Sequence, residues 1–157
     1  MRNLFLYGLY LLFAMSVMAC SATKKAKTRK VNTIIETSRS YTGTPYRYGG
    51  MNRSGIDCSG LLVRSFESAG LSIPRTSKEQ AKYGKGVSKS ELQPGDLVFF
   101  SSKKGKRKIT HVGLVTVTKG KNSVKFIHAS TKLGVVETEF YVDWYQKVFV
   151  KARRPKF

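Results

Sequence analysis

The amino-acid sequence predicts an α+β domain in which helices pack against an antiparallel sheet of about five strands. Apolar residues at helical spacing occur before residue 80, whereas the rest of the chain carries short runs of β-branched and aromatic residues between turn residues. Helices followed by strands, instead of an alternation of the two, are typical of this fold class. The 157 residues suffice for one domain with a modest core.

We place this domain at residues 31–157, after two N-terminal segments. Arg2 precedes an apolar run of roughly 15 residues, which is short for a membrane span of about 20, so residues 1–19 are interpreted as a secretory signal. Residues 20–30 include "ATKKAKTRK", which has many basic residues and no apolar period. This segment is predicted to be a tether.

The signal ends in "VMAC", which resembles the lipobox of bacterial lipoproteins, where the chain is cut before a cysteine that is then acylated. We therefore expect Cys20 to carry lipid and to attach the protein to a membrane, and Ser21 is compatible with the outer membrane, facing the periplasm. Ordinary cleavage after Ala19, which leaves Cys20 as a thiol, is the alternative.

The formal net charge is +20, from 29 basic and 9 acidic residues. Nucleic acid is a common partner of such basic chains, but export argues against it and leaves anionic lipid and a carboxylate-rich cell wall. A second basic run, "KKGKRK" at 103–108, is interpreted as a solvated loop.

The first half of the domain is expected to hold three helices around one loop. Apolar spacing predicts a helix over 31–41, and "GTPYRYGG" at 43–50 is a loop. A helix over about 57–69 carries an apolar stripe, with Asp57 as its N-cap and Gly70 just past its end. A short helix is expected to begin at Thr76 or Ser77. The predicted strands are 96–100, 111–117, 123–130, 134–140 and 147–154.

Cys58 lies in the first turn of the helix that Asp57 caps. Free backbone N–H groups and the positive end of the helix dipole stabilise a thiolate there and lower the pKa of a thiol below about 8.5. A small buried apolar residue is an equally common role for cysteine. A disulfide does not explain Cys58, because the chain has only one other cysteine, Cys20, which is expected to be lipidated.

The chain has two histidines, and they are predicted to be neighbours. If "TKGK" at 118–121 is a hairpin turn, Val117 faces Asn122, and continuing this register puts His111 opposite His128. Two imidazoles and one thiol permit nucleophilic catalysis by Cys58, or a zinc site formed by Cys58, His111 and His128 with one open position. Purely structural roles for these side chains are the third possibility.

The segments "GTPYRYGG", "GIDCSGLLVRSF", "IPRTSKEQ", "LQPGDLVFF", "HVGLV" and "FIHAS" together resemble, in order and spacing, the NlpC/P60 family of papain-like cysteine peptidases. The resemblance covers residues 31–157, and it is greatest to the single-domain outer-membrane lipoprotein murein endopeptidases. It implies that Cys58 is the nucleophile, His111 the general base and His128 the residue that orients His111. It also implies substrate contacts by the side chains of four further residues, Tyr46, Asp57, Ser59 and Arg75; for Arg75 a surface ion pair is the alternative.

By the same resemblance, the substrate is the stem peptide of peptidoglycan, and no metal or organic cofactor is required. The expected activity is hydrolysis of the D-alanyl–meso-diaminopimelate cross-link by a monomer. The alternatives are hydrolysis of the γ-D-glutamyl–meso-diaminopimelate bond within one stem, and a non-catalytic lipoprotein that binds the cell wall. A metal-dependent amidase and an acyltransferase that uses the same triad are further alternatives.

Overall fold

The computed structural model describes residues 23–120 and 123–157, of which residues 23–40 form a helix. The predicted signal peptide and Cys20 lie outside the described residues. The segment over 23–30, which the sequence predicts to be a tether, is helical. Within the described residues, no helix has the length and apolar character that crossing a membrane requires. Residues Val31–Phe157 form one compact unit.

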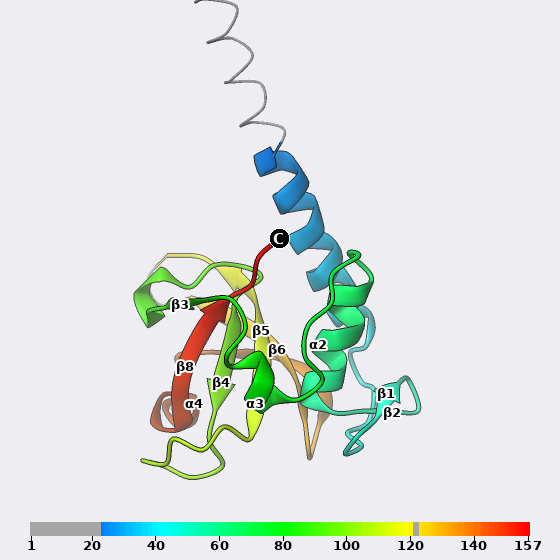
Figure 1. Ribbon diagram of the computed structural model, residues 1–157. Helices are drawn as coiled ribbons and strands as arrows, with labels where there is room; N and C mark the ends of the chain where they lie inside the picture. The colour runs from blue at the N-terminus through cyan, green and yellow to red at the C-terminus, as the bar shows by residue number, and fades with distance from the viewer. Residues whose placement is uncertain (1–22, 121–122) are drawn as a thin grey trace, which may run out of the picture. The chain divides into compact units, whose positions relative to one another are not determined.

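The central element of this unit is a six-stranded antiparallel sheet with the order β3-β8-β4-β5-β6-β7 (Figure 1). Its strands are β3 (Lys85–Val87), β4 (Leu97–Phe100), β5 (His111–Thr118), β6 (Val124–Ser130), β7 (Gly134–Glu139) and β8 (Phe149–Arg154). A two-stranded antiparallel hairpin, β1 (Met51–Asn52) and β2 (Gly55–Ile56), precedes them. The helices are α2 (Cys58–Glu67), α3 (Ser77–Gln80), a 3-10 turn η1 (Lys89–Glu91) and α4 (Asp143–Val148).

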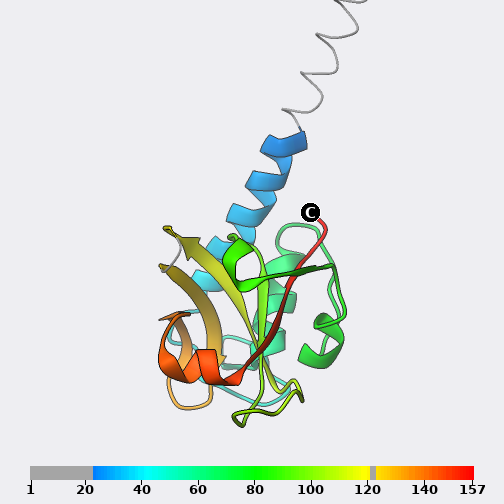
Figure 2. The ribbon, with the colours of Figure 1, turned by 90° about the vertical axis from the view of Figure 1, so that its left-hand side faces the viewer.

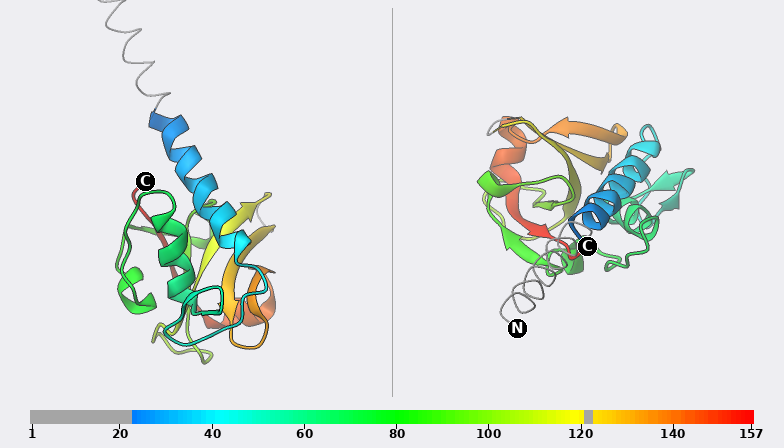
Figure 3. Two further views of the ribbon diagram at one scale, coloured as in Figure 1. Left: turned by 90° about the vertical axis from the view of Figure 1, so that its right-hand side faces the viewer. Right: turned by 90° about the horizontal axis from the view of Figure 1, so that it is seen from above.

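The sheet is covered on both faces at its central strand β4, whose side chains alternate between two apolar clusters. Leu97 and Phe99 pack with α2 and with the helix over 31–40, which lie side by side in Figure 3. Val98 and Phe100 pack in the second cluster, which includes Val148 of α4. Figure 2 turns the molecule so that α4 and β8 are seen together. The α+β class is therefore confirmed, with helices against an antiparallel sheet.

The structure corrects the strand count and one boundary. The sheet has a sixth strand, β3, which carries little apolar surface and is defined by its pairing with β8. The segment over 147–154 was predicted to be a strand throughout, but its first two residues end the helix α4 and the strand begins at Phe149. The aromatic residues of α4 are common in strands, so the sequence gives no helical signal there.

Helix α2 begins after Asp57 as predicted and ends at Glu67, two residues before the predicted end. The Oδ1 atom of Asp57 accepts a hydrogen bond of 2.6 Å from the backbone N–H of Gly60, which is the expected N-cap. Gly70 follows the helix with a φ of 70°, a conformation that glycine adopts without steric cost. The short helix α3 begins after Thr76, whose hydroxyl accepts from the backbone N–H of Glu79. These caps fix the two segments that carry Cys58 and Arg75.

Candidate active site

The thiol of Cys58 is buried at the N-terminus of α2 and is the one free cysteine among the described residues. Burial raises the pKa of this thiol, and the Asp57 carboxylate beside it acts in the same direction. Backbone N–H groups of Val112, Ser59 and Cys58 hydrogen-bond to the sulfur and lower the pKa in part. The expectation of a lowered pKa is therefore wrong for the unliganded protein, because desolvation of the buried thiolate outweighs the helix N-terminus.

The two histidines contact each other through their rings. His111 Nε2 lies 2.9 Å from His128 Nδ1, and the ring centroids are 4.9 Å apart at an angle of 88°. The prediction that the two imidazoles are neighbours is confirmed. They are not directly opposed as predicted, because Thr118 pairs with Val124 and the pairing is irregular between Val115 and Val117.

Beyond that irregularity, Leu114 pairs with Ile127, and continuing the register places His128 opposite Gly113, diagonal to His111. Gly113 leaves room for this arrangement. A Cβ atom there would collide with the ring of Phe126 and lie 3.1 Å from the carbonyl oxygen of Ile127. The Phe126 ring in turn stacks on His128, with centroids 4.9 Å apart. The glycine thus permits the packing that holds the second imidazole.

Burial keeps both imidazoles neutral at neutral pH. It lowers the pKa of His111 to about 4. It also lowers the pKa of His128 to about 3, with a further contribution from His111. A neutral imidazole has one nitrogen that can accept a proton. Because Nε2 of His111 is engaged by His128, Nδ1 is the nitrogen left to act as a base.

The chain on both sides of His111 lies at the Cys58 thiol. Thr110 lines the same pocket as Cys58, and the backbone N–H of Val112 hydrogen-bonds to the Cys58 sulfur. The start of β5 therefore brings the imidazole pair to the N-terminus of α2. The three residues that the family resemblance implies as nucleophile, base and orienting group therefore come from α2 (Cys58), β5 (His111) and β6 (His128).

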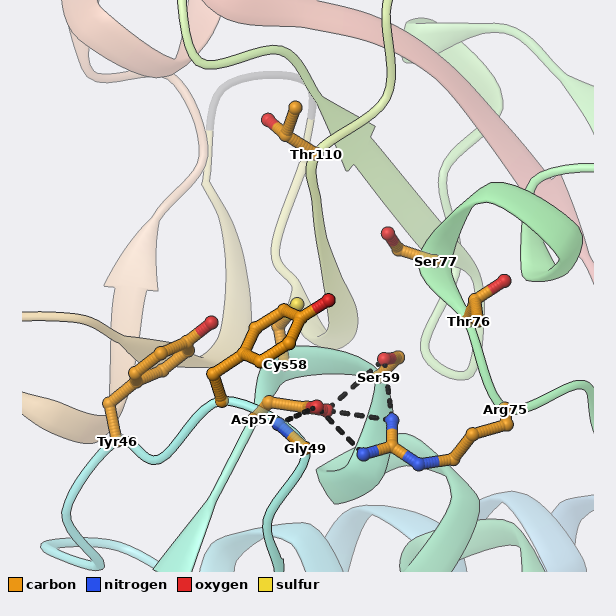
Figure 4. A pocket seen from close by; sticks show the side chains of 10 residues that line it. Tyr46, Gly49, Asp57, Cys58, Ser59, Arg75, Thr76, Ser77 and Thr110 are labelled. Atoms are coloured by element: carbon orange, nitrogen blue, oxygen red, sulfur yellow. Dashed lines mark hydrogen bonds and ion pairs between the residues drawn. The ribbon is translucent and has the colours of Figure 1, made fainter.

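A pocket of about 360 Å³ opens over Cys58. Figure 4 shows Tyr46 on one side of it, and Asp57, Ser59 and Arg75 in a hydrogen-bonded group on the other. All four predicted substrate-contact residues thus line the pocket together with Cys58. Burial raises the pKa of Tyr46, as does the neighbouring Cys58, so its phenol stays protonated and is available as a donor.

Arg75 holds the Asp57 carboxylate from one end. Its Nη1 and Nη2 atoms donate to Oδ1 and Oδ2 of Asp57 at 2.9 Å and 2.7 Å, and Nη1 also donates to the Ser59 hydroxyl at 2.9 Å. The backbone N–H of Gly49 donates to Oδ2 at 2.9 Å. Burial alone would raise the pKa of Asp57, but the bonds from Arg75 and Gly60 outweigh it and lower the pKa. The ion-pair alternative for Arg75 is thus confirmed, with Asp57 as the partner.

Two hydroxyl groups at the site were missed by the sequence analysis. Thr138 Oγ1 and Tyr145 Oη each lie 3.2 Å from His128 Nε2. Tyr145 comes from the unpredicted helix α4. Thr138 lies on the predicted strand over 134–140, but an alternating pattern does not reveal which hydroxyl reaches a histidine. No signal in the sequence could have singled out either residue.

The zinc alternative has no matching ligand cluster in the part of the chain that the structure describes. No group of three or more histidine, cysteine, aspartate or glutamate side chains there is arranged to hold a metal ion. The fold, the buried thiol at a helix N-terminus and the hydrogen-bonded imidazole pair define the class instead, which is that of cysteine-type hydrolases.

Comparison with known proteins gives the family: the chain belongs to the NlpC/P60 family, whose model matches residues 43–154. The probable endopeptidase NlpC of Escherichia coli is 44% identical over 117 residues, which cover 74% of this chain and 72% of that protein. The murein DD-endopeptidase MepS/murein LD-carboxypeptidase of the same organism is 40% identical over 122 residues, or 77% of this chain and 61% of that protein.

A crystal structure of an NlpC/P60 family protein from Bacillus cereus superposes with a TM-score of 0.70 and 32% sequence identity. The match covers 79% of this chain and 39% of the Bacillus protein, so the present chain spans well under half of that relative. The shared part is the fold that carries the thiol and the imidazole pair.

Proposed function

We propose that this protein is a peptidoglycan endopeptidase that hydrolyses the D-alanyl–meso-diaminopimelate cross-link with Cys58 as nucleophile, His111 as base and His128 as orienting residue. The observation that carries the proposal is the hydrogen bond of 2.9 Å between the two imidazoles, one of which is next in sequence to Val112, whose backbone N–H bonds to the Cys58 sulfur. A structural role would not require two neutral histidines to hydrogen-bond to each other at the start of the strand that contacts the Cys58 sulfur. The names of the relatives from Escherichia coli support the substrate class.

The mechanism follows from the neutral resting state. His111 Nδ1 takes the proton as the Cys58 sulfur attacks the carbonyl carbon, and His128 stabilises the imidazolium that forms. Backbone N–H groups at the N-terminus of α2 hold the oxyanion, and the Tyr46 phenol is placed to assist. His111 then protonates the leaving amine, and water attacks the thioester to release the second product.

The state of Asp57 favours the cross-link over the γ-D-glutamyl bond. The ammonium group of a trimmed stem would bind most strongly to a carboxylate on the pocket wall that is not already paired with a cation. Both carboxylate oxygens of Asp57 already accept hydrogen bonds, from Arg75, Gly49 and Gly60. On this side of the pocket, the substrate therefore meets an ion pair between Asp57 and Arg75 and no unpaired negative charge. A stem that continues beyond the cut bond has no free amino group there and needs no such charge.

We further propose that the protein acts as a monomer attached by lipid on Cys20 to the outer membrane of a bacterial envelope, facing the periplasm. The support is the sequence "VMAC" after the apolar run. Nucleic acid is not a partner in this proposal. A net charge of +20 favours attraction to anionic lipid and to the carboxylates of the cell wall.

Digestion of purified peptidoglycan, with the products identified by mass, tests the enzyme. The wild type should hydrolyse stem-peptide bonds, and Cys58→Ala should hydrolyse none, while Cys20→Ala as a matched cysteine control should retain cleavage in solution. Inhibition by iodoacetamide but not by EDTA is expected. Loss of activity with EDTA alone would instead support the metal-dependent amidase.

The bond that is cut is tested on a purified cross-linked dimer muropeptide. Conversion of the dimer to monomers with a new amino group on diaminopimelate is the expected result. Products that end in D-glutamate, with the D-alanyl–diaminopimelate bond intact, would replace this specificity by the γ-D-glutamyl alternative and leave the thiol mechanism intact.

A further inference from the structure

The Nε2 atom of His128, which does not face His111, contacts side chains of β7 and α4 that have no role in the proposed triad. His128 is 3% exposed, so each of its ring nitrogens needs a partner inside the protein. Nδ1 contacts His111, and Nε2 lies 3.2 Å from the hydroxyls of both Thr138 on β7 and Tyr145 on α4. Two hydroxyls from different elements thus converge on one buried nitrogen.

The proton on His128 decides which way the hydrogen bond between the imidazoles runs. When His111 takes up a proton from the thiol, both of its nitrogens carry hydrogen, and Nε2–H needs an acceptor. The partner within hydrogen-bond distance is His128 Nδ1, which can accept only if the His128 proton is on Nε2. That Nε2–H is itself buried and must donate to the hydroxyl oxygen of Thr138 or Tyr145.

We propose that Thr138 and Tyr145 are positioning residues that act through His128 by holding its proton on Nε2, so that Nδ1 faces His111 as an acceptor. This inference rests on the proposed function, in which His111 is the base. The two hydroxyls are the far end of a hydrogen-bonded chain that runs from His111 through His128 to Thr138 and Tyr145. Neither residue touches the substrate pocket, whose lining does not include them.

The surroundings of Tyr145 fix its hydroxyl in place. Its ring packs edge-on against Phe126 with centroids 4.9 Å apart, and against Phe100 at 5.4 Å. The Thr138 hydroxyl hydrogen-bonds to the Tyr145 hydroxyl and holds the pKa of Tyr145 below the value that burial alone would give. Helix α4 therefore couples its own packing to the orientation of the second imidazole.

The test uses variants of the full-length chain that remove only the hydroxyls. Tyr145→Phe keeps the ring contacts, and Thr138→Val keeps the volume. Each single variant should lower kcat by a few-fold, because the other hydroxyl still accepts the proton, whereas the double variant should lose about 10–100-fold in kcat with KM unchanged. Thr138→Ser, which restores a hydroxyl, should stay close to wild type.

Tyr141→Phe is the matched control, since the Tyr141 hydroxyl donates to the backbone carbonyl of Lys89 and not to a histidine. It should leave kcat unchanged. A double variant with wild-type kcat would overturn the proposal, and so would a Tyr141→Phe variant that is as impaired as Tyr145→Phe. Equal melting temperatures of the variants separate loss of positioning from loss of fold.

Nitrogen-15 shifts of the two imidazoles give a readout that needs no substrate. The chain has only two histidines, so His111→Asn assigns the spectrum. Wild-type His128 should carry its proton on Nε2, and the double variant should shift it in part to Nδ1. A wild-type proton on Nδ1 would overturn the inference. If the nitrogen-15 shifts are as expected but the protein cleaves no peptidoglycan, the proposed function is wrong and the inference about the His128 proton still holds.

Discussion

Replacing Asp57 by Asn should destabilise the fold through the ion pair that borders the pocket. The Asp57 side chain is 8% exposed and that of Arg75 is 37% exposed, so the pair is neither fully buried nor a surface pair. Asn keeps a cap acceptor for α2, but its NH₂ group faces the guanidinium or the N–H of Gly49 and leaves a half-buried cation without its partner.

The expected loss lies between two measured limits. Removing one partner of a fully buried pair costs about 3–5 kcal/mol, whereas exposed pairs contribute about 0.2–1 kcal/mol. Arg75 is partly screened by solvent, so we expect Asp57→Asn to lower the free energy of unfolding by about 1–3 kcal/mol at pH 7. Glu67→Gln is the matched control, because its pair with Arg64 is exposed on both sides and should contribute less than about 1 kcal/mol.

The pH dependence gives the sign of the effect. The fold lowers the pKa of Asp57, so the charged carboxylate stabilises the folded state. This contribution is present above the unfolded pKa of about 3.9 and is lost as the pH falls through the folded pKa. In urea denaturation, the gap between wild type and Asp57→Asn should be full at pH 7 and shrink below about pH 4. Equal stabilities at pH 7, or a gap that persists in acid, would refute this reasoning.

The remaining predictions concern the thiol, the imidazoles and the lipid. His128→Asn should retain more activity than His111→Asn, because proton transfer typically contributes about 10²–10⁴-fold and an amide can still orient; the reverse ranking would exchange the two roles. Alkylation of Cys58 should slow steadily as the pH falls below about 8.5, since burial raises the pKa of the thiol; a rate that stays flat to pH 6 would contradict this. Gly113→Ala should destabilise the fold by about 1–3 kcal/mol, whereas Gly86→Ala, whose new Cβ would meet only Arg153 at 3.8 Å, should not; equal melting temperatures would disprove the packing argument. Labelled fatty acid should enter the wild type but not Cys20→Ala, and equal labelling of both would end the lipoprotein proposal.

The elements that carry their own local signal could be predicted from the sequence. Helix α2 has a cap, an apolar stripe and a terminal glycine, and all three lie where they were expected. The strands of the central sheet have strong alternating or apolar runs. In contrast, β3 has three residues of low hydrophobicity, and only its pairing with β8 makes it a strand. Helix α4 has six residues, and tertiary packing decides its conformation.

The sequence identified the residues of the candidate site, but it did not predict their pKa shifts or their hydrogen-bond partners. Cys58, His111 and His128 are rare residue types in this chain, so few alternatives had to be weighed. The hydroxyls of Thr138 and Tyr145 could not be selected among many similar residues. The raised pKa of Cys58 depends on how deeply the helix N-terminus is buried, which tertiary structure alone determines. Likewise, the pairing of Thr118 with Val124, instead of Val117 with Asn122, moved the register without separating the histidines.

Partial alkylation tests the central claim that Cys58 is the nucleophile. Wild-type protein is treated with increasing amounts of iodoacetamide, the fraction modified at Cys58 is measured by peptide mass, and cleavage of purified peptidoglycan is measured on the same samples. The account predicts that activity falls in proportion to the modification of Cys58, reaches zero when it is complete, and is unaffected by EDTA. Full cleavage by protein that is completely modified at Cys58 would contradict it.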